Sequence, residues 1–334
     1  MPNKIPVTQS SLKTLSVCEE QYRLKYVEGL RSREYKPALT IGTAYHLGVE
    51  LHSVDEAEKS YRESRGTPWT EAERVEIETD VSIIRAMVGG ALSRWKIWPL
   101  LREVEFELPL RNPATGAKST RHAFCGVIDG IFPPLQEKPE AVQEGLGSPR
   151  YVLQELKTAG RMSPSYFQRL DLDSQVTDYL IAASDMLGEP VREVVYRVAK
   201  KPGIKPQKKV KRADGIDERG KARFKYSPET PEEFSERVRQ DYLDRPEFYF
   251  FEVIVKRTEE QLDRRRFEMW EAHQRVLRVE AGQMTIRNVR SCLDFGRCDY
   301  LDLCRGVITP EAFDRLDSPH PELASEKENE NACS

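Results

Sequence analysis

The sequence predicts a mixed α/β fold, in which a central sheet has helices beside it. Helical patterns fill most of the first hundred residues, three β-type runs follow between 103 and 158, and helices then alternate with strands up to residue 282. The chain has 334 residues, of which 39% are hydrophobic and 32% are charged. This length suffices for one large domain or two ordinary ones.

The N-terminal part is expected to be helical. Residues 10–27 place leucine and tyrosine side chains at near-helical spacing, and a serine that can cap the helix precedes them. A second helix is expected over 40–53, entered through Gly42, and a long helical region over about 70–98.

Three strands are expected next, as neighbours in one sheet. "EVEFELPL" (103–110) alternates apolar and polar residues, and "HAFCGVIDGIF" (122–132) and "YVLQELKT" (151–158) are rich in β-formers. A polar loop with Pro and Gly separates the last two. Beyond them, helices are expected over 163–187, 230–243 and 258–282, and strands over 192–201 and 248–258.

One folded domain is expected over residues 1–316. We divide it into an N-terminal helical part (9–100), a core (101–260) and a C-terminal helix with a cysteine segment (261–306). The tail over 317–334 is polar and acidic, and we expect it to be disordered.

The net charge of −3 conceals a strongly basic segment. From Lys200 to Lys225, eleven Lys or Arg face three acidic residues, a net of +8. We interpret this segment as a loop whose Lys200, Lys201, Lys205, Lys208 and Lys209 bind phosphate groups. The alternative is a charged loop that is merely solvated.

A cytoplasmic protein is expected, in a bacterial or phage-infected cell and without membrane contact. No apolar run reaches the roughly 18 residues that a membrane span requires, and "MPNKIPVTQSS" lacks the apolar core of a signal peptide. Thiols stay reduced in that compartment, so a cluster of cysteines favours metal binding over disulfides.

Three cysteines stand close together near the end of the chain. Cys292, Cys298 and Cys304 are separated by gaps of five residues. A tetrahedral site for zinc or an iron–sulfur cluster needs four thiolates, so a fourth is missing from this segment. Three incidental buried thiols are the alternative. Cys125 lies inside a predicted strand and Cys333 in the tail, and we leave both out.

Two carboxylates and a lysine are expected to converge on neighbouring strands. Asp129 lies beside Gly130 at the end of an apolar strand, and Glu155 and Lys157 are two apart on the next strand, so they share a face. Carboxylates of this kind bind Mg²⁺ together with water and phosphate, and a bound metal assists phosphodiester hydrolysis. A turn aspartate and an exposed strand ion pair are the alternative.

Three further polar residues accompany them. His46 follows Gly42 by one helical turn, and Gln175 and Tyr179 lie four apart on a helix, so they share a face. An amide and a phenol can bind phosphate or a base. Each of the three also fits an ordinary structural role.

The motifs G-x-x-x-H, G-x-x-D, E-x-K-T and Q-x-x-x-Y, in this order, resemble the RecB-like branch of the PD-(D/E)XK nuclease superfamily. The resemblance spans about residues 9 to 306 and implies a restriction-endonuclease-like mixed sheet flanked by helices. It implies that His46, Asp129, Glu155 and the main-chain carbonyl of Leu156 bind Mg²⁺ or Mn²⁺. It also implies that Lys157 is catalytic, and that Gln175 and Tyr179 contact DNA. Ile128 stands before Asp129 where the motif name has Pro.

The cysteines are similar to those of a subgroup that includes the AddB nuclease domain and CRISPR adaptation nucleases. That subgroup holds a [4Fe–4S] cluster with one N-terminal and three C-terminal cysteines. The resemblance therefore implies that Cys18 joins Cys292, Cys298 and Cys304. Zinc remains the alternative metal, because four thiolates suit either.

The expected function is metal-dependent DNA hydrolysis, with an exonuclease acting on single-stranded ends as the preferred form. The expected setting is DNA repair, recombination or phage DNA processing, with a helicase or recombination protein as a possible partner. Two alternatives remain: a catalytically silent DNA-binding or scaffold protein stabilised by its metal cluster, and a zinc-stabilised RNA-processing factor.

Overall fold

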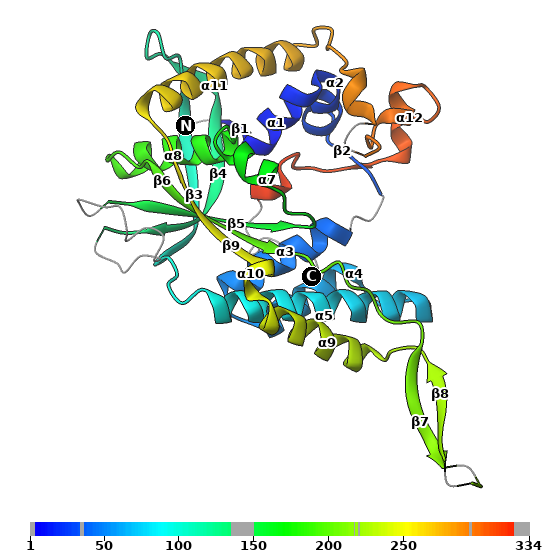
Figure 1. Cartoon of the computed structure of the whole chain (residues 1–334). Helices are drawn as coiled ribbons and strands as arrows, with labels where there is room; N and C mark the ends of the chain where they lie inside the picture. Colours follow the sequence, from blue (N-terminus) through cyan, green and yellow to red (C-terminus); the bar gives the residue numbers. More distant parts are fainter. Residues whose placement is uncertain are drawn as a thin grey trace, which may run out of the picture.

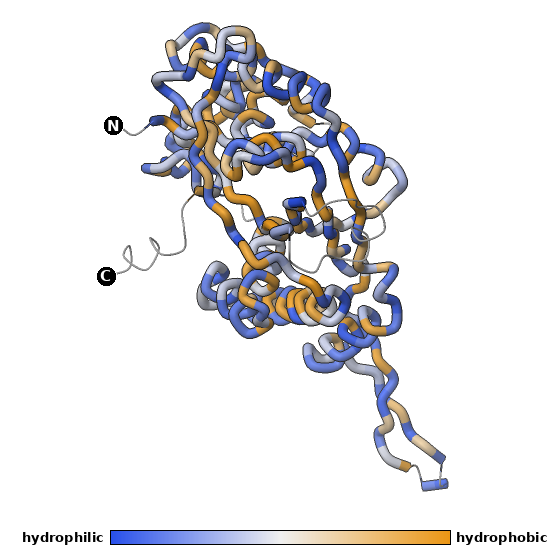
Figure 2. The backbone as a smooth tube through the Cα atoms, turned by 90° about the vertical axis from the view of Figure 1, so that its left-hand side faces the viewer, coloured by the Kyte–Doolittle hydropathy of each residue, from blue (hydrophilic) through white to orange (hydrophobic). Residues whose placement is uncertain are grey.

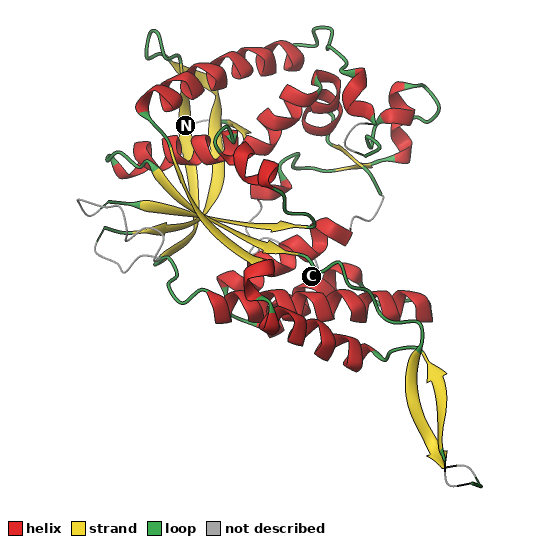
Figure 3. Cartoon of the chain, viewed as in Figure 1, coloured by secondary structure: helices red, strands yellow, loops and turns green. Residues whose placement is uncertain are grey.

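A computed structural model describes residues 4–33, 37–134, 150–216, 218–219, 221–293 and 296–323. A twisted six-stranded sheet crosses the middle of the molecule, and helices pack on both of its faces (Figure 1). Figure 3 shows the same arrangement by element type, with one two-stranded hairpin standing apart from the body. The mixed α/β class predicted from the sequence is confirmed.

The sheet combines parallel and antiparallel pairs. Strand β4 is antiparallel to β3 and β5, and it is parallel to β1. Strand β6 is parallel to β5 and antiparallel to β9. The strands are β1 (Ile5–Val7), β3 (Leu101–Arg111), β4 (Lys118–Phe132), β5 (Val152–Ala159), β6 (Glu193–Lys200) and β9 (Phe250–Lys256).

Two hydrophobic cores lie on opposite faces of the sheet. One is formed with α1, α8 and α11, and the other with α3, α4, α5 and α9. The helices are α1 (Gln9–Val17), α2 (Glu19–Tyr22), α3 (Pro37–Glu50), α4 (Val54–Arg65), α5 (Glu71–Arg94), α7 (Pro164–Leu170), α8 (Ser174–Leu187), α9 (Pro231–Asp244), α10 (Pro246–Tyr249), α11 (Glu259–Glu280) and α12 (Leu301–Cys304). Figure 2 shows hydrophobic positions recurring along the central strands and the helices that pack on them.

Arg197 in β6 holds three strands together beneath the second core. Its side chain is 1% exposed and donates to Gln154 of β5 and Glu252 of β9, both at 2.7 Å. Its guanidinium also lies about 5 Å from the rings of Trp95 and Trp98. Because each of these partners offsets part of the desolvation of the buried charge, Arg197 fixes the relative placement of β5, β6 and β9.

Three predicted helices have different bounds. The helix predicted over 10–27 breaks at Cys18, whose backbone is extended (φ −163°, ψ 121°), and it ends in a π-helical turn, Arg23–Val27. The helix predicted over 163–187 is divided, because the Asp173 side chain caps the Val176 N–H and starts α8. The helix predicted over 40–53 starts at Pro37, so Gly42 lies inside α3.

The basic segment is a loop over 201–209, as predicted, but from Val210 onward it forms a hairpin that was not predicted. Its strands are β7 (Val210–Ile216) and β8 (Ala222–Ser227), which pair antiparallel from Val210↔Ser227 to Ile216↔Ala222. Alternating Lys, Arg and aromatic residues satisfy the period-two pattern of a strand, and the high charge masked this signal in the sequence.

Segments from the two ends of the described chain pack together. Strand β2 (Leu30–Arg31) pairs with β10 (Asp314–Arg315), and Arg31 donates to the Pro319 carbonyl at 2.6 Å. His320 is buried and stacks on Tyr26, with 5.0 Å between ring centroids. The expected disorder is therefore wrong for this part of the tail, and the residues from 324 onward lie outside the described part.

A buried polar network joins α11 to β4. His273 Nε2 lies 3.1 Å from His122 Nδ1 and 3.2 Å from Ser119 Oγ, and His122 Nε2 lies 3.0 Å from Glu280. Burial, followed by the nearby His122, lowers the pKa of His273 to about 4.

In the described part of the chain, no helix is long and apolar enough to cross a membrane.

Two adjacent glycines in α5 test how closely this helix packs on β9. A Cβ atom at Gly90 would lie 2.6 Å from Phe250 Cζ, whereas one at Gly89 would meet nothing within 4 Å. Gly90→Ala should destabilise the fold by about 1–3 kcal/mol through overpacking. Gly89→Ala, the matched control, should stabilise it by up to about 1 kcal/mol, because alanine favours the helix. Urea denaturation measures both, and changes of the same sign would contradict the packing.

The buried His273 should make stability depend on pH. Because its folded-state pKa of about 4 lies below its ordinary value, the unfolded chain binds more protons between pH 6.5 and 4, and stability falls as the pH falls through this window. In His273→Gln, the free energy of unfolding that is lost between neutral and acidic pH should be smaller by on the order of 1–2 kcal/mol. Urea denaturation of both proteins at neutral and acidic pH measures it, and parallel pH profiles would overturn it.

Candidate active site

A fork in the sheet places Asp129. Strands β4 and β5 pair only over Gly130–Phe132 and Val152–Gln154, and β1 pairs with β4 at His122–Phe124. Where β4 and β5 part, Asp129 Oδ2 accepts a hydrogen bond from the Leu156 N–H at 2.6 Å. The carboxylate thus takes the place of a missing β-ladder partner, in the interior of β4 and not at its end.

Gly130 lets the chain approach this fork. A Cβ atom at this position would lie 2.3 Å from Pro99 Cγ and 3.4 Å from Gln154 Cβ. Only glycine fits between these two side chains without a shift of the backbone. The glycine beside Asp129 therefore serves close packing rather than a turn.

Glu155 and Lys157 lie together, as the period-two pattern predicted. Lys157 Nζ forms an ion pair with Glu155 Oε1, and Glu155 is only 2% exposed. Leu156 between them belongs to the core on the opposite face, which confirms the predicted alternation. The two charges thus face the α8 side of the sheet.

Helix α3 brings His46 to the same place. At Gly42 the helix passes so close to β5 that a Cβ atom would lie 3.4 Å from Thr158 Oγ1. His46 follows one turn later, half-buried. Burial, together with the nearby positive charge of Lys157, lowers its pKa to about 4, so the imidazole is neutral at pH 7.

Helix α8 contributes Gln175, whose Nε2 donates to Glu155 Oε1 at 2.8 Å. Tyr179, one turn further on, is half-buried, and its ring packs edge-on against Phe106 with centroids 6.0 Å apart. The two predicted residues therefore have different contacts: Gln175 donates to the Glu155 carboxylate, whereas Tyr179 packs against Phe106 and hydrogen-bonds Gln175.

Electrostatics set this group apart from the ion pairs on the surface. Burial raises the pKa of Asp129, and it raises that of Glu155 to about 7 despite the opposing effect of Lys157. Burial lowers the pKa of Lys157, but Glu155 and Asp129 more than offset this, and the net shift is upward. Two partly desolvated carboxylates beside one lysine leave negative charge that another cation would stabilise.

We call Asp129, Glu155, Lys157, His46 and Gln175 the carboxylate site. Its donor set fits a hard divalent cation, namely the buried carboxylate of Glu155, the half-buried carboxylate of Asp129 and a neutral imidazole. Among the described residues, however, no group of three or more His, Cys, Asp or Glu side chains surrounds a position for a metal ion. The reason is visible in the contacts: Lys157, Gln175 and the Leu156 N–H take up the carboxylate oxygens.

A sequence profile of the PD-(D/E)XK nuclease superfamily matches residues 6–305. The chain belongs to this superfamily. Its nucleases typically use Mg²⁺ or Mn²⁺, and membership implies a DNA substrate. The chain is similar to a crystal structure from Eubacterium rectale that is described provisionally as an exonuclease. The two sequences are 13% identical, the match covers 95% of this chain and 92% of the other, and the TM-score is 0.48. No curated protein matches the chain.

Sequence reasoning missed two carboxylates near the site of this PD-(D/E)XK protein. Glu50, one turn after His46 on α3, raises the pKa of Asp129, and Asp173, the cap of α8, raises that of Lys157. The four-residue spacing of His46 and Glu50 was a usable signal, because it places both on one helix face. For Asp173, the sequence held no signal beyond its position as the cap of a helix.

The predicted phosphate-binding lysines start at the edge of the sheet that bears the carboxylate site. Because β5 and β6 are parallel, Lys200 pairs with Ala159, two residues after Lys157. Lys200 Nζ lies 3.3 Å from the Phe248 ring centroid, and burial lowers the pKa of Lys201. The remaining three, Lys205, Lys208 and Lys209, are exposed and lead to the hairpin.

The four predicted cluster cysteines lie at one end of the molecule, but among the described residues no three of them come close enough together to hold a metal ion. Burial raises the pKa of Cys298, and negative charge on Cys292 and Cys18 raises it further; Cys304 responds likewise to Cys298 and Cys18. Each of the four thiols therefore has another within electrostatic range. Cys125 is buried in β4, and Cys333 lies outside the described residues.

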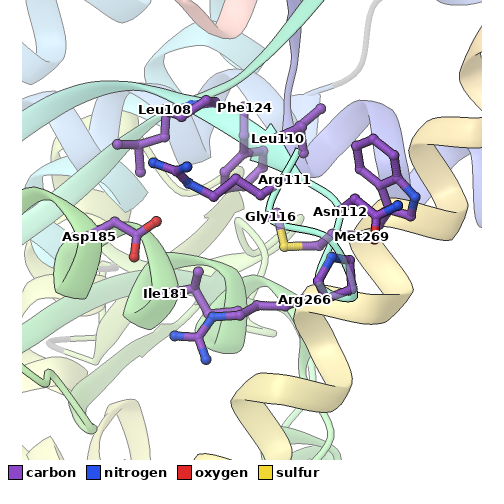
Figure 4. Close-up of a pocket in the computed structure, with 13 residues that line it drawn as sticks. Leu108, Leu110, Arg111, Asn112, Gly116, Phe124, Ile181, Asp185, Arg266 and Met269 are labelled. Carbon is purple, nitrogen blue, oxygen red and sulfur yellow. The ribbon is translucent and has the colours of Figure 1, made fainter. Parts of the chain in front are cut away.

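A separate pocket of about 440 Å³ lies between β3, β4, α8 and α11 (Figure 4). Arg111, Asp185 and Arg266 point into it together with Met269. No residue of the carboxylate site lines it. The pocket is therefore distinct from the site at the fork.

Proposed function

We propose that this PD-(D/E)XK protein is a metal-dependent deoxyribonuclease of the RecB-like branch, an exonuclease that hydrolyses single-stranded DNA from its ends. The observation that carries the proposal is the carboxylate site, where the half-buried Asp129 and the buried Glu155 have raised pKa values beside Lys157. Buried, charge-perturbed groups of this kind are typical of catalytic centres.

Asp129, Glu155, His46 and the Leu156 carbonyl would hold Mg²⁺ or Mn²⁺. When bound, the ion would neutralise charge on the phosphodiester and favour the ionisation of water. A cation there would compete with Lys157 for Glu155, which would free the ammonium group for the substrate. Lys157 would then orient the attacking water and stabilise the negative charge that develops on phosphate oxygen. Gln175, held by Glu155, would position the DNA strand.

The four cysteines support a second proposal, a [4Fe–4S] cluster at Cys18, Cys292, Cys298 and Cys304. Four thiolates suit such a cluster, the four thiols here lie within electrostatic range of one another, and zinc is the competing metal. Cys18 lies at the extended residue between α1 and α2, and the other three belong to the segment after α11. The cluster would join these distant segments and act as a structural clasp, because none of its ligands belongs to the carboxylate site.

Repair, recombination or phage DNA processing in the cytoplasm is the setting we propose for this activity. A helicase or recombination protein would supply the single-stranded ends. The basic segment that starts beside the carboxylate site supports a substrate held through its phosphates.

The nuclease proposal is tested with end-labelled single-stranded DNA and Mn²⁺. Asp129→Asn and Lys157→Met should each lower the hydrolysis rate by about 100-fold or more, because they remove a metal ligand and a charge-stabilising group. Lys256→Met is the matched control, since Lys256 pairs with Glu193 at 3.1 Å elsewhere in the same sheet, and its rate should stay within a few-fold.

Equal rates in all these variants would refute catalysis at the carboxylate site and favour a silent DNA-binding protein. A circular single strand distinguishes the two forms of cleavage. We expect it to resist digestion, and rapid cleavage of the circle would replace the exonuclease with an endonuclease.

The cluster proposal is tested by metal analysis of anaerobically purified protein. Cys18→Ser should lose iron and visible colour as fully as Cys298→Ser does, because both supply ligands. Cys125→Ser, the control from the core of β4, should keep the iron. Full iron in Cys18→Ser would place the fourth ligand elsewhere, and a colourless wild type with stoichiometric zinc would replace the cluster with zinc.

A further inference from the structure

The β7–β8 hairpin projects from the body of the molecule beyond the end of α9 (Figures 1 and 2). Most of its residues are exposed, and they include three large hydrophobic ones: Ile216 (71%), Phe224 (50%) and Tyr226 (65%). An isolated hairpin is only marginally stable in water. Exposed aromatic side chains on such an element therefore call for an explanation.

The register of the hairpin sorts its side chains onto two unlike faces. Lys211 pairs with Tyr226, and Ala213 pairs with Phe224, so these residues share one face, which we call the aromatic face. On this face Lys211 Nζ lies 3.9 Å from the Phe224 ring centroid.

The opposite face is engaged with the protein. Arg212 forms an ion pair with Glu233 at the start of α9 and also bonds Ser227. Lys225 lies 3.4 Å from Asp214 across the hairpin. Because these contacts turn one face toward α9 and its own acids, the aromatic face is the one presented outward.

Charge identifies the kind of partner that suits the aromatic face. Residues 205–227 carry nine Lys or Arg against three Asp or Glu, a net of +6 in a chain whose net charge is −3. An apolar protein partner would meet a surface crowded with positive charges, whereas a polyanion would be attracted to them. Aromatic rings interleaved with lysines are the arrangement that binds single-stranded nucleic acid, since bases stack on the rings and phosphates meet the cations.

We propose that the aromatic face is a stacking platform for single-stranded DNA. Bases of the strand lie on Phe224 and Tyr226, and Lys211 neutralises the adjacent phosphates. The exposed Lys205, Lys208 and Lys209 connect this platform to the edge of the sheet where Lys157 lies. The proposal deepens the nuclease function by assigning a second contact on the same strand, at a distance from the carboxylate site.

The competing explanation is that the rings only stabilise the hairpin. Aromatic cross-strand neighbours do so by about 0.2–1 kcal/mol per pair. The double variant Phe224→Val/Tyr226→Thr separates the two explanations, because Val and Thr keep high β-propensity but offer no ring on which a base can stack. Phe267→Leu is the control, since Phe267 is another exposed ring (56%), on α11.

The test measures binding by fluorescence anisotropy in EDTA, without divalent metal, so no hydrolysis contributes. The probes are an oligothymidylate of about 20 nucleotides and a base-free strand of the same length. Wild type should bind the oligothymidylate at least about tenfold more tightly than the base-free strand. The double variant should lose most of this preference, while Phe267→Leu retains it. Lys211→Thr should weaken binding to both probes and reduce the salt dependence by about one phosphate contact.

Equal binding of the two probes by wild type would overturn the proposal, whatever the variants do. So would an equal loss for both probes in the double variant, which would leave the rings a structural role. Hydrogen exchange over 210–227 shows whether the variant hairpin stays paired. Asp129→Asn and Lys157→Met should keep the preference for bases, so a failure of the platform and a failure of the nuclease proposal are separate results.

Discussion

The geometry of the carboxylate site depends on one hydrogen bond, from the Leu156 N–H to the Asp129 carboxylate. It replaces a backbone ladder bond where β4 and β5 part, and it allows β4 to take β1 as its next partner. Without the fork, Glu155 and Lys157 would lie on a regularly paired strand with no carboxylate from β4 beside them. A half-buried carboxylate is a costlier hydrogen-bond acceptor than a carbonyl oxygen, because its charge is partly desolvated. Burial accordingly raises the pKa of Asp129 above its ordinary value.

The site is built by close approach from three directions. Gly130 leaves room for the side chains of Pro99 and Gln154, and Gly42 leaves room for that of Thr158. From α8, Gln175 donates a hydrogen bond to Glu155. The opposite face of the same strands is rigid, because Arg197 joins β5, β6 and β9. The ion pair of Lys157 with Glu155 thus lies on strands that Arg197 holds in fixed relative positions.

Periodicity predicted much of this arrangement. The alternation of Glu155, Leu156 and Lys157 and the four-residue spacing of Gln175 and Tyr179 fixed which side chains share a face, since the period follows from backbone geometry. What escaped prediction depends on tertiary contacts. The break at Cys18, the burial of Tyr179 against Phe106 and the nearness of Glu50 to Asp129 arise from packing between distant segments. The hairpin was not predicted for another reason. Its many charged residues hid the period-two alternation that is typical of strands.

The pairing of β2 with β10 has a consequence for biosynthesis. The two strands lie about 280 residues apart, and the cysteines gather beside the same junction. At about 5–20 residues per second, a ribosome needs roughly 15–60 s to deliver the second strand after the first. Leu24 and Leu30, buried against Tyr300 and Phe313 in the finished protein, stay uncovered for that time. The junction between the two segments therefore forms only after β10 has been synthesised, and the same holds for any contact between Cys18 and Cys304.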